Sequence, residues 1–471
     1  MFQNKIRSQL FSILASIAMG VVGLTILGGY VVAGPSIPEA TQSSGWVVQD
    51  DTIFGDRIDM VSADDGWMLK LGYHENLDDK SAYLYRWNGN SWSLYTTLPH
   101  TQLALRADID MLSATDGWVA IGGPLGGSSN LAESTIYHWD GTSWQKYGTI
   151  TAPNAVALES IDMLSPTDGW ASGPFNFGTV YYHWDGNTWQ LVKQGFGDFT
   201  GDGLDMVSSS DGWSVGSGIS HWDGADWTAF TSPITTTLNA VSMVSASDGW
   251  IVGGGYIFDP NTGQTVPEPG VILHWNGTVW NEVASPVEDR LLALDMVSAD
   301  DGWIVGENGT ILHWDGVSWE EYSNPYLYPN DWLSIDMLTS KSGWMAGFGG
   351  VLVYETRPEL AINVADGSPG SFFTLTGSDF PANEEATVNI NGHDLGAVST
   401  NENGGFTLIL STADADEGLY SVTVRVNPSA TTSFVLDSEA PLRPKEGAGT
   451  EISVPANIAQ TERLFLPFIS R

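Results

Sequence analysis

Six aspartates recur at one position of the chain, directly before a methionine, and their carboxylates are the first candidates for chemistry. They are Asp59, Asp110, Asp162, Asp205, Asp295 and Asp336, and Ser242 takes the place in a seventh copy. A carboxylate repeated once per structural unit is buried or lines a shared channel, and a buried one must be hydrogen-bonded. The pattern favours a structural latch to backbone or tryptophan N–H donors, and the alternative is a ring of carboxylates that holds a cation.

Other polar residues offer metal ligands. Asp198, Asp202 and Asp205 lie close together in sequence and form a weak calcium candidate, although the match to an EF-hand loop is poor and an Asp-rich turn is the alternative. Five histidines each stand directly before a tryptophan, one per repeat, which is too dispersed for a shared metal site. They are His138, His183, His221, His274 and His313. We therefore expect no cofactor.

These residues belong to a repeat in which an apolar strand ends in Asp-Met or Ser-Met and is followed by an (Asp/Ser)-Gly-Trp turn. Its tryptophans are Trp67, Trp118, Trp170, Trp213, Trp250, Trp303 and Trp344. The Asp and Gly residues suit tight hairpin turns and are structural in this interpretation. Short strands repeated at intervals of roughly 40 to 50 residues predict a β-propeller with four strands per blade.

A second phrase, Trp-(Asp/Asn)-Gly-x-x-Trp, follows the first in six repeats and is missing from the seventh. The last blade therefore lacks one strand, and the segment around Trp46 is a candidate to supply it. Such sharing would remove an open sheet edge. We expect an all-β chain whose residues 46–357 form a seven-bladed β-propeller, closed by an N-terminal strand in the last blade.

The two rims of such a ring differ in sequence. Turns within the repeated phrases have constant length, whereas the loops of the opposite rim vary, and length variation belongs on loops that recognise something. Aromatic residues on these variable loops are the candidates for ligand binding: Tyr73, Phe175, Phe177, Tyr256, Phe258, Tyr326, Tyr328 and Trp332. Trp332 leads because no repeat rule requires it, and an extra packing contact is the alternative.

Composition limits the partners. The formal net charge of -39 disfavours binding to nucleic acid or to an anionic membrane surface, because either would be repelled. Cysteine is absent, so the chain has no disulfide. Residues 1–33 combine Lys5 and Arg7 with a long uncharged stretch, which predicts a signal peptide or an N-terminal anchor, followed by a linker over 34–45. We expect the rest of the chain to lie outside the cytoplasm, secreted or anchored.

After the propeller the sequence changes character. Residues 358–437 contain alternating strands separated by Gly-, Asn- and Asp-rich turns, which predict a small β-sandwich. The stretch 438–463, rich in Pro, Glu, Gly and Ala, is typical of a flexible linker, and 464–471 forms an apolar tail. The sandwich is similar to immunoglobulin-like modules of bacterial surface proteins, which implies a role in spacing or adhesion.

The repeat resembles the seven-bladed family of photosystem II assembly and stability factors, in the phrases Asp65-Gly66-Trp67 and Asp301-Gly302-Trp303-Ile304-Val305-Gly306. This resemblance implies a scaffold without enzymatic activity that holds newly made membrane-protein subunits. The Trp-Asp-Gly-x-x-Trp hairpin also resembles the Asp-box turn of sialidase-like propellers. Sialidase chemistry would require a cluster of three arginines, and the span from Trp46 to Tyr354 has only Arg57, Arg86, Arg106 and Arg290, scattered along the sequence.

Together these features predict a non-catalytic, extracytoplasmic binding protein whose variable loop face recognises a protein partner. A carbohydrate-binding surface module is the alternative, with a glycan as ligand. A polysaccharide-active glycosidase is a weaker alternative, because the chain's many carboxylates neither prove nor exclude a catalytic pair.

Overall fold

The computed structural model describes residues 45–460 apart from 75, 77, 101–102, 124–133, 151–156, 176–177, 197–199, 260–263, 323–329, 356–357 and 427–428. The predicted signal or anchor over 1–33, the predicted linker over 34–45 except for residue 45, and the tail over 464–471 lie outside this part. Within the described residues there is no helix of the length and apolar character needed to cross a bilayer.

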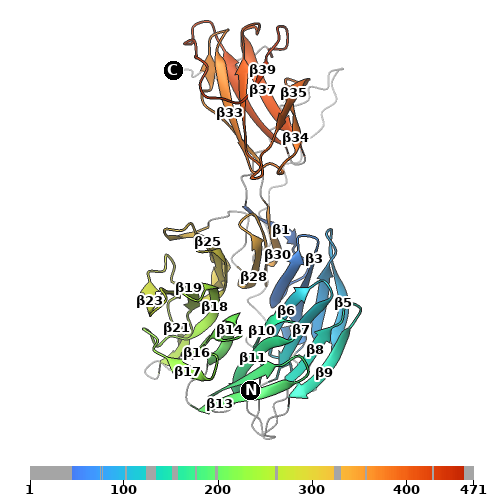
Figure 1. Cartoon of the computed structure of the whole chain (residues 1–471), viewed down its shortest axis with the longest axis vertical. Coiled ribbons are helices and arrows are strands. Elements are labelled where there is room, and N and C mark those ends of the chain that lie inside the picture. The colour runs from blue at the N-terminus through green and yellow to red at the C-terminus, as the bar shows by residue number, and fades with distance from the viewer. Residues whose placement is uncertain are drawn as a thin grey trace, which may run out of the picture. The chain divides into compact units, whose positions relative to one another are not determined.

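The described residues before 356 form seven four-stranded antiparallel sheets, and the expectation of an all-β chain is confirmed (Figure 1). The first sheet contains β2 (Arg57–Ser62), β3 (Asp65–Leu71), β4 (Ala82–Trp87) and β5 (Trp92–Leu98). The second contains β6 (Arg106–Ser113), β7 (Asp116–Gly122), β8 (Ser134–Trp139) and β9 (Trp144–Ile150). The third contains β10 (Ser160–Ser165), β11 (Asp168–Phe175), β12 (Gly178–Trp184) and β13 (Trp189–Phe196). The fourth sheet contains β14 (Thr200–Ser208), β15 (Asp211–Gly216), β16 (Ile219–Trp222) and β17 (Trp227–Phe230). The fifth contains β18 (Leu238–Ser245), β19 (Asp248–Gly253), β22 (Val271–Trp275) and β23 (Trp280–Val283). The sixth contains β24 (Leu291–Ser298), β25 (Asp301–Gly306), β26 (Ile311–Trp314) and β27 (Trp319–Glu321).

The seventh sheet joins the two ends of the propeller span. It contains β28 (Trp332–Thr339), β29 (Ser342–Gly347), β30 (Gly350–Glu355) and β1 (Gly45–Asp50), and Figure 1 shows β1 beside β30. Trp46 of β1 lies opposite Tyr354 of β30 in antiparallel register. The strand that the sequence assigned to Trp46 therefore occupies the outer position of this sheet.

Sulfur packing explains why glycine precedes the tryptophan in each (Asp/Ser)-Gly-Trp turn. Gly66 pairs with Met60 across β2 and β3, and a Cβ on Gly66 would collide with Sδ of Met60. Gly117 has the same relation to Met111 in the second sheet. The methionine and the glycine of the repeat are thus one packing unit, which couples two residues that stand several positions apart in the phrase.

Tryptophans lock each sheet to the next. The buried Trp67 of the first sheet lies 5.0 Å from Trp139 and 5.3 Å from Trp144 of the second, measured between ring centroids. In the last sheet, Trp46 and Tyr354 take the place of such a pair, at 5.5 and 5.3 Å from Trp303. Trp344 of that sheet in turn lies 4.8 Å from Trp87 of the first. Edge-to-face and tilted aromatic pairs of this kind therefore hold the sheets together around the ring.

Three smaller elements interrupt the repeat. A hairpin of β20 (Tyr256–Asp259) and β21 (Gln264–Pro267) extends the connection between β19 and β22. Short 3₁₀ helices occupy η1 (Gly72–His74) and η2 (Glu307–Gly309). All three lie in connections between a second and a third strand, where the sequence predicted variable loops.

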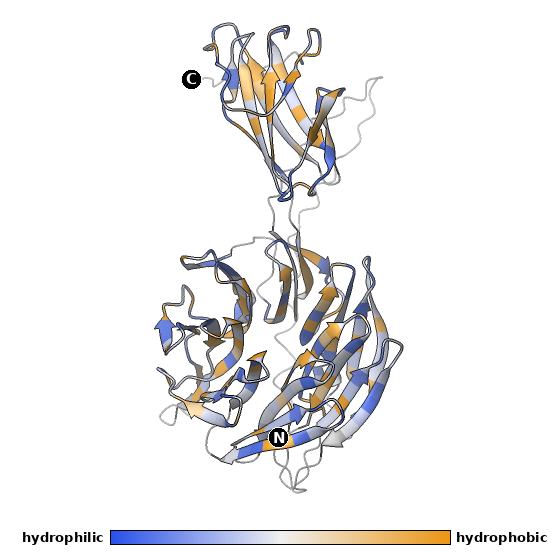
Figure 2. Ribbon diagram, in the orientation of Figure 1, coloured by the Kyte–Doolittle hydropathy of each residue, from blue (hydrophilic) through white to orange (hydrophobic). Residues whose placement is uncertain are grey.

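The residues after 357 form two further sheets. One contains β31 (Glu359–Ile362), β33 (Phe372–Ser378), β36 (Phe406–Ser411) and β39 (Thr450–Ser453), and the other β32 (Asp366–Gly367), β38 (Ala430–Leu436), β37 (Gly418–Arg425), β34 (Glu385–Ile390) and β35 (His393–Ser399). Both sheets contribute to one core, in which Phe373 stacks on Phe434. Figure 2 shows hydrophobic residues along these strands. The expected two-sheet sandwich is therefore present.

The boundary of the sandwich differs from the expectation. Residues 438–460, predicted as part of a flexible linker, pack onto the sandwich, because β39 pairs in parallel with β36 and Val454 is fully buried. The side chain of Asn391 donates to the carbonyl of Ile458, and Leu419 bridges to Gln460. The Pro- and Glu-rich composition suggested a linker, but this stretch also contains the apolar residues Ile452 and Val454, which are buried against the sandwich. The strand β39 around Ile452 adds an edge strand next to β36.

Candidate functional site

The repeated carboxylates link neighbouring sheets through the backbone. The N–H of Met111 donates to Oδ2 of Asp59 at 2.6 Å, and the N–H of Met337 donates to Oδ2 of Asp295 at 2.6 Å. The same bond joins Met163 to Asp110, Met206 to Asp162, Met243 to Asp205 and Met60 to Asp336, and Met296 donates to the hydroxyl of Ser242. Each sheet thus accepts one bond from the next, and the predicted latch to backbone donors is confirmed.

Burial of this ring changes its proton affinity. Burial raises the pKa of Asp110 and of Asp205 to about 7, and burial together with the neighbouring Asp295 carboxylate raises the pKa of Asp336 to about 8. Burial, then Asp336, then Asp110 also raise the pKa of Asp59. Burial therefore favours the neutral form of these carboxyl groups, since neighbouring buried carboxylates cannot all ionise cheaply.

The cation alternatives find no support among the residues that the structure describes, since no group of three or more His, Cys, Asp or Glu there could hold a metal ion. Asp205 of the calcium candidate belongs to the latch with Met243. Asp202 lies near Arg106 and Arg290, and Asp198 lies outside the described residues. The weak calcium prediction is therefore not carried further.

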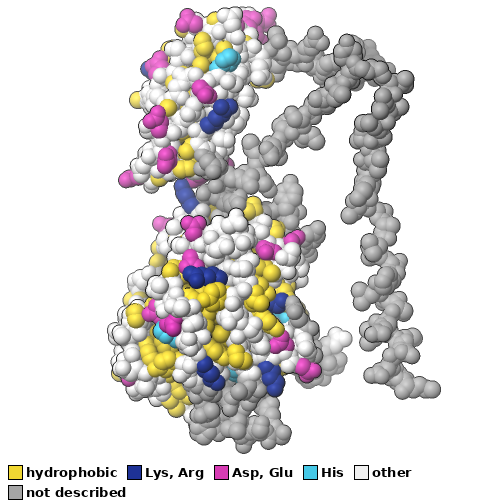
Figure 3. All heavy atoms as spheres, turned by 90° about the vertical axis from the view of Figure 1, so that its right-hand side faces the viewer, with side chains coloured by type: hydrophobic (Ala, Val, Ile, Leu, Met, Phe, Trp, Pro, Cys, Tyr) yellow, Lys and Arg dark blue, Asp and Glu magenta, His cyan; other side chains and the backbone are white. Residues whose placement is uncertain are grey.

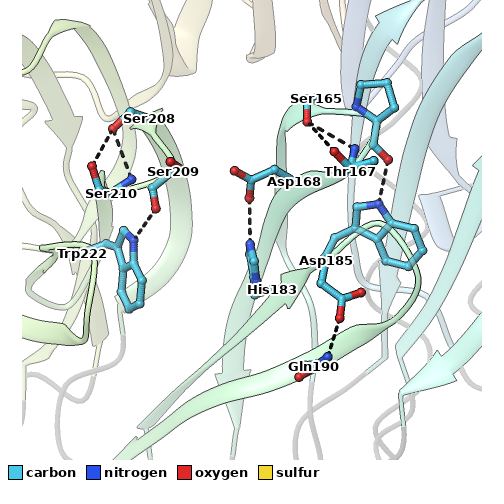
Figure 4. A network of polar contacts seen from close by, with 12 residues as sticks. Ser165, Thr167, Asp168, His183, Asp185, Gln190, Ser208, Ser209, Ser210 and Trp222 are labelled. Carbon is cyan, nitrogen blue, oxygen red and sulfur yellow. Dashed lines mark hydrogen bonds and ion pairs between the residues drawn. The ribbon is translucent and has the colours of Figure 1, made fainter.

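One rim of the ring, here called the turn rim, is formed by the turns between first and second strands and between third and fourth strands. There each repeated histidine contacts the aspartate of its own Asp-Gly-Trp turn, as in His183 and Asp168 at 2.7 Å (Figure 4). The indole N–H of Trp222 donates to the carbonyl of Ser209, and the N–H of Thr188 donates to the side chain of Asp185. The first contact pairs two side chains and the other two satisfy turn backbone groups, so the polar side chains of the turn rim are engaged in structural contacts.

Sequence reasoning missed the His–Asp pairs, although the repeats held a signal for them. In the first sheet Arg86 replaces the histidine and pairs with Asp65 at 2.8 Å. In the seventh sheet, Ser342 replaces the aspartate and Val353, opposite Trp344, replaces the histidine. The acidic position thus keeps its aspartate where a basic partner is present and loses it where the partner is lost, which indicates contact across the hairpin.

The opposite rim, here called the mouth rim, contains a cavity of about 430 Å³ where the first strands of the sheets begin. Arg57, Arg106 and Arg290 all line it. Arginines that are scattered along the sequence therefore come together in space, because three of the four between Trp46 and Tyr354 line this cavity. The sequence concealed this convergence because the three residues belong to different repeats.

Each of these arginines already has a carboxylate partner. Arg106 pairs with Glu159, and Nε of Arg57 lies 3.4 Å from Oδ1 of Asp108. Arg290 donates to the carbonyl of Gly254 and to the side chain of Asn239, and its Nη1 lies 3.6 Å from Glu307. These contacts hold the guanidinium groups in fixed orientations, since a guanidinium presents its donors in a rigid plane.

A second group of polar residues completes the cavity wall. The buried Asp56 accepts from the N–H of Leu71 and lies 2.7 Å from Nε2 of His74. The ring of His74 contacts Tyr73 and Phe348, with centroids 4.0 and 5.2 Å away. Burial, followed by the charge of Asp56, raises the pKa of Tyr73, so its hydroxyl remains a donor at neutral pH. Burial raises the pKa of Asp202, also in the wall, to about 6.

The predicted binding aromatics fall into three groups. Trp332 and Phe175 are 1% and 0% exposed in the hydrophobic core, so the expectation that they face a ligand is wrong. Trp332 begins β28 and packs in the cluster of Trp46 and Trp303, which is the packing alternative.

Of the others, Tyr73 lines the cavity and Tyr256 is 53% exposed on β20. The side chain of Phe258, and the whole of Phe177, Tyr326 and Tyr328, lie outside the described residues.

Comparisons with known proteins give structural likeness only. No family model and no curated protein matches the chain. Among solved structures, one described as "YCF48 bound to D1 peptide" has a TM-score of 0.49 and 17% identity, covering 67% of this chain and 98% of that chain. "YCF48 from Cyanidioschyzon merolae" has a TM-score of 0.48 and 11% identity, with 66% and 99% covered. The "WD40 beta propeller domain of Doa1" has a TM-score of 0.46 and 11% identity, with 67% and 97% covered.

Proposed function

We propose that this chain is a non-catalytic binding protein whose mouth rim recognises a partner protein outside the cytoplasm. The turn rim is occupied by repeated structural contacts, such as that of His183 with Asp168. The mouth rim is irregular, because three of its connections carry extra elements, namely η1, η2 and the β20–β21 hairpin. Recognition belongs on irregular loops held by a rigid scaffold.

The β20–β21 hairpin is the observation that carries this proposal. Tyr256 and Ile257 of β20 are 53% and 50% exposed, although both are large and mainly apolar. The hydroxyl of Tyr256 donates to Glu307 at 2.7 Å, and the guanidinium of Arg290 lies 5.8 Å from the Tyr256 ring centroid. The hairpin is thus tied to the next sheet and presents an aromatic and an aliphatic side chain in fixed positions, a composition favoured at protein interfaces.

Catalysis is not part of the proposal. Two of the carboxyl groups in the cavity wall are engaged with neighbours, Glu159 with Arg106 and Asp56 with His74.

The uncharged stretch within residues 1–33 supports export or anchoring. We further propose that the sandwich acts as a spacer or an adhesion module. The partner would be a membrane or surface protein, as the sequence resemblance to photosystem assembly factors implies.

Site-specific photocrosslinking tests the proposal. A benzoylphenylalanine placed at Ile257 in the full chain should crosslink a defined partner in the cells that make this protein. Val317, which is 82% exposed on the turn rim, provides the matched control because it is also β-branched and apolar. The variant Ile257→Ser should reduce capture from a second mouth-rim position, whereas Val317→Ser should not. Equal capture from positions 257 and 317, or none from either, would contradict the proposal.

A further inference from the structure

The β20–β21 hairpin of the mouth rim has an edge without a strand partner. In sequence β20 follows β19 and β21 precedes β22, so the outer edge of β20 continues the side of β19 that pairs with β18. That pairing stops where Leu238 of β18 meets Gly253 of β19, and among the described strands none pairs with either outer edge of the hairpin. A hairpin of two strands is only marginally stable alone, and a third strand stabilises it.

The register determines which backbone groups face this edge. The N–H of Glu268 donates to the carbonyl of Gly255, and Ile257 lies two residues further along the same ladder. Because hydrogen-bonded pairs alternate with non-hydrogen-bonded pairs in an antiparallel ladder, Ile257 bonds to β21 as Gly255 does. The backbone N–H and C=O groups of Tyr256 and Phe258 therefore point away from β21, to the free edge of β20.

The opposite edge of the hairpin is a poorer template for a strand. Pro267 of β21 lies opposite Tyr256 in a non-hydrogen-bonded pair, so the N–H that proline lacks is missing from the outer edge of β21. Proteins block edge strands with proline, lysine or a bulge. The residues of β20, Tyr256–Asp259, contain neither proline nor lysine, and their register with β21 has no bulge. The unprotected edge of the hairpin is therefore that of β20.

This geometry selects an extended chain as the occupant. Backbone donors and acceptors at two-residue spacing are satisfied by another strand, whereas a helix bonds its backbone groups internally. Tyr256 and Ile257 point to opposite faces of the hairpin and are both exposed, so apolar side chains of an added strand can pack beside each. The net charge of -39 disfavours an acidic segment.

We infer that the partner protein binds through an extended, non-acidic segment that adds to β20 as a third strand of the hairpin. Main-chain hydrogen bonds provide the affinity, and the side chains beside Tyr256 and Ile257 provide the selectivity. This inference rests on the proposed function, because it specifies how the mouth rim holds its partner.

Phage-displayed peptides of random sequence, selected on the purified full-length chain, provide the probe. A selected peptide is synthesised, N-methylated at one residue at a time, and titrated into the chain by isothermal calorimetry. Alternate N–H groups of an added strand face β20. Methylation should therefore weaken binding by about tenfold or more at every second residue of the bound segment, with little effect at the residues between.

Proline substitutions on the two edges of the hairpin give matched variants. Tyr256→Pro removes an N–H from the free edge without removing a bond to β21, and should weaken peptide binding by about tenfold or more. Tyr256→Ala removes the side chain but keeps this N–H, so its effect should be smaller. Thr265→Pro makes the same change at a non-hydrogen-bonded position of β21 and should leave the affinity unchanged. Circular dichroism checks the folding of each variant, and the methylation series needs none of them.

The inference fails if no peptide is selected, if the methylation effects do not alternate, or if Tyr256→Pro binds as tightly as Tyr256→Ala. A dimer of the chain that Tyr256→Pro dissociates and the peptides do not would assign β20 to a second copy, which also overturns it. Because these titrations contain no cells, their failure leaves crosslinking from position 257 standing. Absent crosslinking beside alternating methylation effects would contradict the proposed function and not the strand pairing.

Discussion

The carboxylates next to methionine show how one residue type can serve the fold without serving chemistry. Each accepts a backbone N–H of the next sheet, and Ser242 performs the same task without a charge. Spacing alone was sufficient to predict a latch, because a buried carboxylate must be hydrogen-bonded. It could not identify the donor, which lies a whole repeat away in sequence. The convergence of Arg57, Arg106 and Arg290 was hidden for the same reason.

This ring predicts an unusual dependence of stability on pH. Burial raises the pKa of Asp110 from 3.8 to about 7, so the folded chain binds this proton more tightly than the unfolded chain. The associated stability is fully present below about pH 4 and is lost as the pH rises through about 7. Asp110→Asn keeps an acceptor for Met163 and removes the ionisation. We compare the free energy of unfolding of Asp110→Asn with that of the parent chain. The difference should be more favourable to the variant at pH 8 than at pH 5, by on the order of 1 kcal/mol or more.

Urea unfolding of Asp110→Asn and the parent chain at both pH values measures this difference. Asp300→Asn, an exposed change in the turn before Asp301, is the control and should show the same small effect at pH 5 and pH 8. An Asp110→Asn effect that does not change with pH would contradict a protonated ring.

At the scale of elements, the tryptophan phrases predicted the strands well. In the sixth repeat, for example, β24, β25, β26 and β27 form one sheet of four strands, as the repeat predicted. The hairpin of β20 and β21 was not predicted as strands, because its sequence carries none of the repeated residues. The repeated tryptophan phrases therefore predict the strands that all the sheets share. They do not predict an element that occurs in one sheet connection, such as the β20–β21 hairpin.

The outermost strands of the first three sheets have features that limit edge pairing. A β-bulge interrupts the register of β5, β9 and β13 at the same position in each. Exposed hydrophobic residues of β5 and β9 include Leu94, Tyr95 and Tyr147, and Figure 3 shows hydrophobic side chains gathered on one face of the propeller. Bulged edges are poor templates for another strand. We therefore attribute the bulges to protection of these edges.

Strand β1 gives a direct test at this scale. Trp46 is 1% exposed and packs against Trp303 and Tyr354, so Trp46→Ala would leave a void between two sheets. We expect a loss of roughly 3–5 kcal/mol in the free energy of unfolding. Val48→Ala, in the same strand but 49% exposed, should change it by less than about 0.5 kcal/mol. Chemical denaturation followed by tryptophan fluorescence measures both, and similar small losses would show that β1 is dispensable.

For the whole molecule, the sequence predicted two kinds of β-structure in the correct order. It placed the end of the sandwich too early, because Ile452 and Val454 stand alone in a Pro-rich stretch and their partners lie in β36. Alternation within a strand can be recognised locally, whereas a single added edge strand depends on a distant neighbour. The division of the propeller into a rim of constant turns and a rim of variable connections was foreseen from loop lengths, but not the charged cavity of the mouth rim.

Hydrogen–deuterium exchange of the full chain, with and without the partner captured at position 257, tests the central claim that recognition belongs to the mouth rim. We predict slower exchange on partner binding in β20, β21 and η1, with no change in turn-rim segments such as Asp315–Ser318. Protection confined to the turn rim, with unchanged exchange in β20, β21 and η1, would contradict it.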